Sequence, residues 1–181
     1  MTDREITRLA TSAFPLLPEN LAQDLLRRGC TIPQPVFARQ PQNAIKGQFA
    51  RPGQVDWAVL CSVKGRSSIL VFWNGSDINP ASIAPVSDDH FIQGIGQGKF
   101  GFSRAIAAVG RSYIPAHAAV SGPKGSNAPV IDHQGIDDAF VERGPWSTIR
   151  SRLKSQSASG SPPNCQETTR PSLHLLSFSV R

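Results

Sequence analysis

Aspartate and histidine residues gather at two places in the chain, and they are its residues best suited to chemistry. Residues 88–90 read Asp-Asp-His, and residues 132–138 carry an Asp-His pair at their start and two aspartates at their end. Carboxylates and imidazoles bind divalent metals and act as general acids or bases. A metal-dependent hydrolase needs about three such ligands around an open coordination position. The residues that would serve such an enzyme are Asp89, His90, Asp132, His133, Asp137 and Asp138.

The placement of these two groups decides between two functions. Convergence of 88–90 with 132–138 within metal-ligand distance favours a metal-dependent, hydrolase-like enzyme, whereas scattering over separate surface turns favours a non-enzymatic binding domain. Nucleophiles give no competing signal, because Ser62, Ser67 and Ser103 lie in no G-x-S-x-G motif. We therefore expect a non-enzymatic binding or interaction domain, without catalytic residues or an organic cofactor, whose partner the sequence does not identify and for which a protein is one candidate. The metal-dependent enzyme is the alternative.

A glycine-rich stretch offers a third chemistry. Residues 96–101 read Gly-Gln-Gly-Lys-Phe-Gly and match the G-x-G-x-x-G spacing, which in dinucleotide folds lets backbone amides approach a pyrophosphate at a helix N-terminus. A nucleotide-binding enzyme would need a helix that begins near Gly98. No βαβ pattern surrounds the motif, and the next acid after Asp89 is Asp132, too distant to bind a ribose. The pattern favours tight turns.

Two segments resemble the loop-strand unit of FG-GAP (VCBS-type) repeats, in which an acidic, glycine-containing calcium loop runs directly into an apolar strand. Residues 132–141, Asp-His-Gln-Gly-Ile-Asp-Asp-Ala-Phe-Val, carry the resemblance, and residues 47–60 are similar in outline. The resemblance implies Ca²⁺ as a bound ion, with Asp132, Asp137 and Asp138 as its ligands.

The first of these segments departs from the family pattern. Arg51 and Gln54 stand where the family places Asp or Asn, so residues 47–60 should not bind calcium. Two copies also cannot close a propeller. The resemblance therefore predicts a turn followed by a strand in each segment, and calcium in the second segment alone.

The secondary structure predicted around these residues is that of a single α+β domain over residues 1–142. We expect a first helix from Thr2 or Asp3 to about Ala13, and a second that begins at Pro18 and ends at Gly29. These short N-terminal helices would pack on a mostly antiparallel sheet. Capping residues and an apolar stripe at Leu21, Leu25 and Leu26 support the second helix.

The sheet is predicted from a three-stranded meander over residues 44–73. Its strands are 44–50, 55–62 and 67–73, separated by turn residues, and the third is apolar on both faces, which is typical of a central strand. We expect Trp57 and Trp73 in the core. Further along the chain, we expect a loop over 77–90 and a short strand at 91–95, and the stretch at 102–109 is open between strand and helix. After it, we expect a weak helix at 113–120 and a loop at 121–129. A turn within 130–141 should lead to a final strand near 139–142.

The predicted tail, residues 143–181, differs from the rest of the chain. It is rich in Ser, Arg and Pro and has no core-facing period, which is typical of disorder. A further hypothesis is an out-of-frame, non-native extension that replaced a closing strand. Of the chain's 19 basic and 13 acidic residues, 6 basic and 1 acidic lie from Arg143 onward, leaving 13 and 12 before it. The positive charge therefore belongs to the tail, and we expect only non-specific attraction to nucleic acid.

Cysteine usage and apolar runs bear on the compartment. Cys30, Cys61 and Cys165 have no C-x-x-C spacing. In a reducing cytosol, Cys30 and Cys61 would be buried thiols. If the protein is exported, a disulfide between them is an alternative. No apolar run is long enough to span a bilayer, so no membrane association is expected. The start reads as no secretory signal, which gives the cytoplasm as the default prediction.

Overall fold

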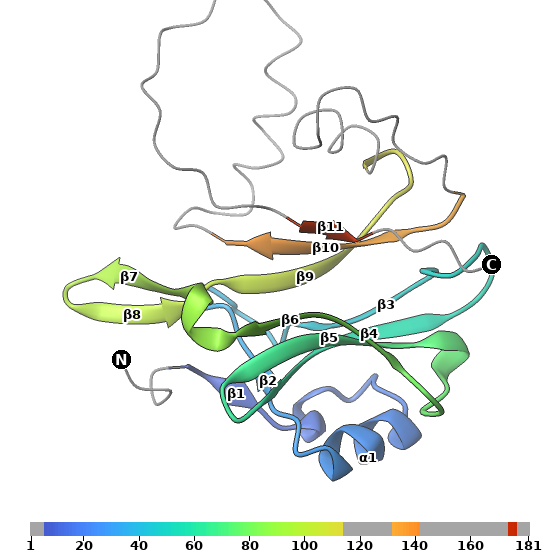
Figure 1. The fold of residues 1–181 in the computed structure, drawn as a ribbon, viewed down its shortest axis with the longest axis horizontal. Helices are drawn as coiled ribbons and strands as arrows, with labels where there is room; N and C mark the ends of the chain where they lie inside the picture. The colour runs from blue at the N-terminus through green and yellow to red at the C-terminus, as the bar shows by residue number, and fades with distance from the viewer. Residues whose placement is uncertain (1–5, 114–131, 142–173, 177–181) are drawn as a thin grey trace, which may run out of the picture.

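The computed structural model describes residues 6–113, 132–141 and 174–176. Figure 1 shows three layers: helix α1 (Glu19–Arg27) lies below a four-stranded antiparallel sheet, and a second antiparallel sheet lies above it. The strands of the middle sheet, in spatial order, are β3 (Ala44–Gly47), β4 (Asp56–Val63), β5 (Arg66–Phe72) and β6 (Ala81–Ser87). Those of the upper sheet are β11 (His174–Leu176), β10 (Gly135–Phe140) and β9 (Arg104–Val109).

The middle sheet contains the three predicted strands, but it has four strands because β6 is added, and its first strand ends at Gly47 rather than at residue 50. β4 lies between β3 and β5, in a register that pairs Trp57 with Phe72 and Val63 with Arg66. The prediction of a central, doubly covered third strand is confirmed: Leu70 and Phe72 pack in the core on the α1 side, and Ile69 and Val71 in the core on the other side. Strand residues alternate between faces, so the apolar run at residues 69–72 of β5 fills both cores at once.

The prediction of a loop over residues 77–90 is wrong. Ala81–Ser87 form β6, which pairs with β5, and Asp88–Phe91 form the 3₁₀ turn η4. Pro85 within the run argued against a strand, because proline cannot donate to a β-ladder. The structure accommodates it on the edge of the sheet, where the pairing with β5 shifts register between Ser67 and Ile69.

The first predicted helix, ending near Ala13, is also wrong for the described residues. Arg8–Leu9 form strand β1, which pairs with β2 (Ile32–Pro33), and Thr11–Ala13 form the 3₁₀ turn η2. A short isolated helix is marginal, and pairing with a distant strand outweighs local helix propensity. The described residues therefore contain one α-helix rather than two, on a mostly antiparallel framework.

Helix α1 confirms the second predicted helix. Pro18 immediately precedes it, and Gly29, at φ +70°, follows its end. The Cys30 amide donates to the Leu25 carbonyl, and the Gly29 amide to the Leu26 carbonyl, which is the Schellman ending that a glycine permits. Leu21 and Leu25 are fully buried, but Leu26 is 64% exposed and does not belong to the buried stripe.

The glycine-rich stretch is a β-hairpin that projects from one end of the molecule (Figure 1). β7 (Ile92–Gly96) pairs with β8 (Lys99–Phe102), and the two turn residues Gln97 and Gly98 both have positive φ. Such a turn matches the twist of a hairpin. No helix begins near Gly98, so the nucleotide-binding interpretation is wrong. In the open stretch at 102–109, Phe102 ends β8 and Arg104–Val109 form strand β9. The final strand, predicted near 139–142, begins earlier than predicted and forms β10, so Asp137 and Asp138 lie in a strand rather than in a loop.

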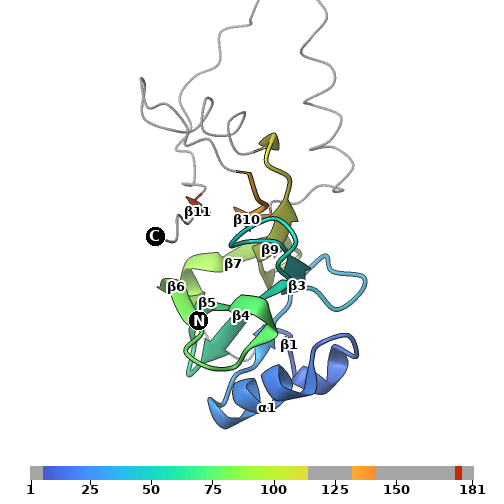
Figure 2. The same cartoon turned by 90° about the vertical axis from the view of Figure 1, so that its right-hand side faces the viewer.

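The layers enclose two cores, one on each face of the middle sheet (Figure 2). The α1 side holds Trp57, which confirms its core prediction, and Trp73 is partly buried on the other side. Cys30 and Cys61 are joined by a disulfide in the α1-side core. No helix within the described residues is long and apolar enough to cross a membrane. The weak helix and loop predicted at 113–129 lie mostly outside the described residues, as does the predicted tail apart from β11.

Candidate functional site

Arg104 and Asp138 form an ion pair inside the protein. Asp138 in β10 is paired with Ile106 of β9, two residues along the strand from Arg104, so both charged side chains lie on one face of the upper sheet. The Arg104 Nε donates to Oδ1 of Asp138 at 2.8 Å, and Nη2 donates to Oδ2 at 2.7 Å. Arg104 is 0% exposed and Asp138 is 7% exposed. Both carboxylate oxygens are therefore occupied by one guanidinium in a fork geometry.

The remaining donors of Arg104 reach the middle sheet. Its Nη1 donates to the Ser67 Oγ at 2.9 Å, and its Nη2 donates to the Ala84 carbonyl at 3.0 Å. The guanidinium carbon also lies 4.9 Å from the centre of the Phe91 ring. One buried cation thus connects β9, β10, β5 and β6. Its charge holds the two sheets together and is shielded from solvent.

Asp88 forms a second ion pair, with Arg8. Arg8 of β1 donates to the Asp88 Oδ2 at 2.7 Å, and the Ser62 hydroxyl donates to the same oxygen at 2.6 Å. Asp88 is 1% exposed, and its Oδ1 has no hydrogen-bond partner within the described residues. Its backbone amide donates to the Gly65 carbonyl at 2.9 Å. Asp88 therefore anchors the N-terminal strand to the turn between β4 and β5.

The two ion pairs meet at a pair of serines. Ser62 and Ser67 are directly opposite each other in the β4–β5 register, so their side chains share a face of the sheet. Ser62 contacts Asp88, and Ser67 contacts Arg104. We call this group the polar cluster; its members are Arg8, Ser62, Ser67, Asp88, Arg104 and Asp138. One acid from each predicted group belongs to it, but each acid is paired with its own arginine.

The predicted metal ligands do not share a site in the described residues. Asp132 is exposed, as are Asp89 and His90. Asp137 and Asp138 are consecutive in β10, so their side chains leave opposite faces of the strand. No group of three or more His, Cys, Asp or Glu residues in the described chain could hold a metal ion. The calcium ligand set stays a prediction.

Asp137 acts on a neighbouring phenol instead. The Tyr113 hydroxyl donates to the Asp137 Oδ2 at 3.4 Å. Burial raises the pKa of Tyr113 to about 12, and the adjacent carboxylate charge and hydrogen bond of Asp137 add to the rise. His133 of the same segment is buried, with its Nδ1 2.8 Å from the Gln134 carbonyl oxygen.

Asp56 is a buried acid that the sequence analysis did not single out. It opens β4 and is fully buried. Its Oδ2 accepts the amides of Phe49 and Ala50, and its Oδ1 accepts the amide of Asn74 and the side chain of Gln54. Four donors satisfy the carboxylate, which ties the 49–54 turn to the end of β5. An Asp at the start of an apolar strand, three residues after the turn glycine Gly53, was a signal available in the sequence.

The two segments that resemble each other in sequence lie side by side. The Gln134 amide donates to the Gln48 carbonyl, and the Gln48 amide donates to the Gln134 Oε1, both at 2.9 Å. A methyl group at Gly47 would approach that same Oε1 to 3.1 Å and the Phe49 ring to 2.5 Å. Glycine therefore permits the close approach of the two segments at this point.

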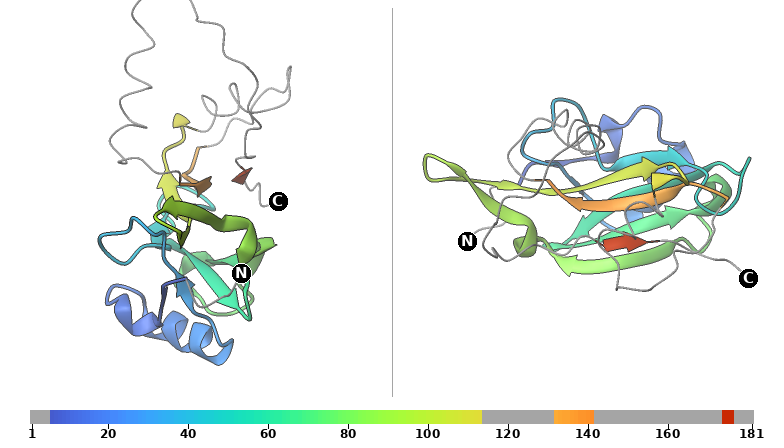
Figure 3. Two further views of the ribbon diagram at one scale, coloured as in Figure 1. Left: turned by 90° about the vertical axis from the view of Figure 1, so that its left-hand side faces the viewer. Right: turned by 90° about the horizontal axis from the view of Figure 1, so that it is seen from above.

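The outer side of β10 pairs with the short strand β11 within the described residues. β9 pairs with all six residues of β10, from Gly135 to Phe140. β11 pairs antiparallel with only three of them, residues 136–138. Figure 3, in the view from above, shows this short strand beside β10 on the side away from β9. The backbone at Gly135, Ala139 and Phe140 extends beyond the described β11.

Comparison with family models, with curated proteins and with solved structures found no match for this chain. The arrangement therefore has to be interpreted from its own geometry. Two residues of the polar cluster, Arg8 and Arg104, were missed by the sequence analysis. For Arg104 a signal exists, because a lone arginine interrupts the apolar stretch Phe102–Val109. A charge inside a buried strand requires a partner.

Proposed function

We propose that this protein is a non-enzymatic interaction domain that binds an extended segment of a partner protein along β10. The observation that carries the proposal is the pairing of β10 at this edge with a short antiparallel strand: within the described residues, β11 pairs with three of its six residues. An exposed strand edge presents backbone donors and acceptors that another chain can pair with. Backbone pairing supplies affinity, and alternate side chains supply specificity.

The edges of the middle sheet are less suited to this role. β6 is irregular, because Ala84 has φ +48° and Pro85 has no amide hydrogen. Bulges and prolines protect edge strands from pairing with other chains. On the opposite edge, next to β3, the Asn43 side chain accepts the Ile106 amide at 2.9 Å and donates to the Arg104 carbonyl, which connects this edge to β9.

The occupant we propose is an antiparallel, apolar strand. The register of β11 provides the pattern, because its residues His-Leu-Leu pair along the backbone with Asp138, Asp137 and Ile136 in turn. A partner segment of six residues would extend this pairing over Gly135, Ala139 and Phe140. It would replace β11, so the chain's own segment and the partner compete for one edge.

The metal-dependent enzyme is not supported by the described geometry. Asp88 and Asp138 are each bound to an arginine, and Asp89, His90 and Asp132 are exposed at separate places. A hydrolytic metal centre needs several ligands around one open position. No observation in the described residues favours this class over the interaction domain.

The test uses the chain's own strand as a probe. A fluorescent peptide of residues 172–178 (Ser-Leu-His-Leu-Leu-Ser-Phe) is titrated into the full chain carrying Leu175→Pro, whose proline prevents β11 from pairing. We expect saturable binding to this variant, at least tenfold weaker binding to the unmodified chain, and amide shifts confined to β10. Failure of the variant to bind the peptide would overturn the proposal.

Two controls make the result specific. The same peptide with proline at the position of Leu175 should not bind, because it cannot form the ladder. A peptide of scrambled order tests whether the apolar residues alone are responsible. Equal binding of all three peptides, or shifts at β6 instead of β10, would contradict pairing at this edge.

A further inference from the structure

A covalent connection joins the helix layer to the middle sheet. Cys30 follows Gly29 directly after α1, and Cys61 lies within β4; their Cα atoms are 5.2 Å apart and 31 residues separate them in sequence. The two residues are 6% and 4% exposed. This Cα separation lies in the range that a disulfide requires. The bridge therefore needs no displacement of either backbone.

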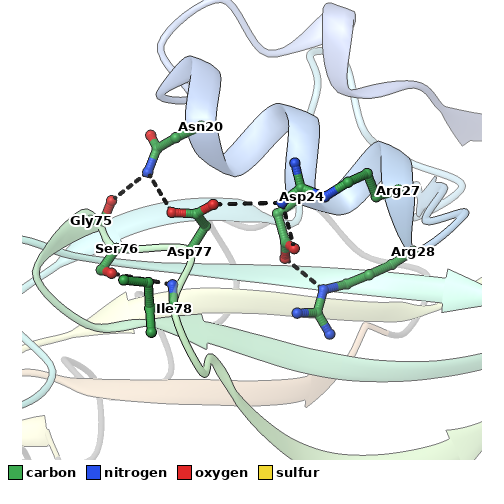
Figure 4. Close-up of polar contacts among 8 residues, drawn as sticks. All are labelled: Asn20, Asp24, Arg27, Arg28, Gly75, Ser76, Asp77 and Ile78. Atoms are coloured by element: carbon green, nitrogen blue, oxygen red, sulfur yellow. Dashed lines mark hydrogen bonds and ion pairs between the residues drawn. The ribbon is translucent and has the colours of Figure 1, made fainter.

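The noncovalent contacts of α1 with the sheet are of two kinds. Leu21 and Leu25 are fully buried against the sheet. Two contacts drawn in Figure 4 join α1 to the segment after β5 on the exposed side: the Asn20 side chain donates to the Gly75 carbonyl at 3.0 Å, and Arg27 lies 3.5 Å from a carboxylate oxygen of Asp77. Exposed polar contacts of this type contribute little to the free energy that holds α1 on the sheet.

The disulfide lies next to a place where the chain leaving the helix pairs with β4. Thr31 and Ser62 exchange backbone hydrogen bonds of 3.0 and 2.8 Å, one residue beyond each cysteine. The covalent bond and this isolated β-bridge together fix the end of α1 on the sheet. Besides the bond, the buried Leu17, Leu21 and Leu25 pack against the sheet in the same core.

We infer that the Cys30–Cys61 disulfide is a required part of the mature fold, and that the protein folds in an oxidising compartment. Disulfides persist outside the cytosol and are rare within it. In the step we propose, the two thiols reduce one molecule of a small disulfide, such as oxidised glutathione, to two thiols. The Cys30 and Cys61 sulfurs are joined, and their two protons pass to the released thiols. The inference is independent of the function of β10.

The first measurement identifies the bond. Full-length protein refolded in a mixture of reduced and oxidised glutathione is alkylated without a reductant, digested and analysed by mass spectrometry. We expect one peptide pair linked through Cys30 and Cys61, and alkylation at Cys165. Alkylation of all three cysteines, or a bridge that includes Cys165, would overturn the inference.

The second measurement tests whether the fold depends on the bond. Reduction should raise the unfolding equilibrium constant roughly several hundred-fold and lower the melting temperature by roughly 10 °C. Cys30→Ser and Cys61→Ser should each melt at the lower temperature and no longer respond to the reductant. Cys165→Ser is the matched control and should behave as the unmodified chain. An unmodified chain that melts at the same temperature with and without the reductant would refute the dependence, whatever the variants do.

Discussion

The segments at 47–60 and 132–141 share a sequence pattern, but their acids have different partners. In the first, Asp56 accepts hydrogen bonds from backbone amides of its own turn and of Asn74. In the second, Asp138 is held by the buried guanidinium of Arg104 from the neighbouring strand. One acid is thus satisfied by neutral donors close in sequence, and the other by a charge 34 residues away.

This difference shows what an acidic turn before a strand can mean. A carboxylate at such a position accepts whatever donors the fold brings to it: amides, a guanidinium or a metal ion. The pattern predicts the turn and the strand, because those depend on local residues. The partner of the acid depends on tertiary structure. The following predictions test whether the two acids really stabilise the fold by these different means.

Replacement of Asp138 by alanine should have the largest effect. The change leaves Arg104 buried without its counter-charge, and breaking a buried pair in this way costs about 3–5 kcal/mol. Urea denaturation of the variant and of the unmodified chain measures the loss. The double variant Arg104→Met with Asp138→Leu should recover much of it, because it removes both charges. A loss below about 1 kcal/mol for Asp138→Ala would contradict the importance of the pair.

Replacement of Asp56 by alanine should cost less, about 2–3 kcal/mol. The variant loses an acceptor for the amides of Phe49 and Asn74, and an unsatisfied buried group costs about 1–3 kcal/mol. No buried charge is left behind, which is why the effect should be smaller than at Asp138. Asp56→Asn keeps one oxygen and should fall between the alanine variant and the unmodified chain. An Asp56→Ala loss larger than that of Asp138→Ala would reverse the comparison.

The sequence predicted those parts of the fold that depend on neighbouring residues. Helix α1 begins after Pro18 and ends before Gly29, and both signals are local. The meander followed from its alternation and its turns. β1 could not be predicted in this way, because Arg8 finds Asp88 across 80 residues of sequence. β6 was not predicted because Pro85, which cannot donate a backbone hydrogen bond, argued against a strand.

The candidate sites show the same limit. Asp137 and Asp138 were recognised as acids of interest, but their opposite orientation follows only once residues 135–140 are known to be a strand. The pairing of Arg104 with Asp138 depends on the β9–β10 register, which single-sequence patterns do not define. The pairing at the outer edge of β10 likewise depends on which strands become its neighbours.

The effect of Asp137 on Tyr113 offers a smaller and more local test of the second segment. The folded chain holds the Tyr113 phenol proton up to a pKa of about 12, above the ordinary value of 10.0. Stability should therefore be fully present below pH 10 and decrease as pH rises from 10 towards 12. Tyr113 is the single tyrosine of the chain, so its near-ultraviolet absorbance reports this titration directly.

The variant Asp137→Asn separates the causes of this shift. Removal of the carboxylate charge should lower the pKa of Tyr113 part of the way, because burial, the largest cause, remains. Asp132→Asn is the matched control, since Asp132 is exposed in the same segment. An unchanged titration in Asp137→Asn would show that Asp137 does not act on the phenol.

Calcium should have the smallest effect, and it tests the resemblance of residues 132–141 to calcium-loop repeats. Asp138 already has both oxygens on Arg104, and Asp137 points to the other face of β10. We therefore expect no measurable rise in melting temperature with added Ca²⁺. A bound ion at 100 times its dissociation constant would add about 2.7 kcal/mol of stability. A rise of that size that is lost in Asp137→Ala would mean that the segment rearranges around calcium. The two segments would then differ in metal binding as well as in the partners of their acids.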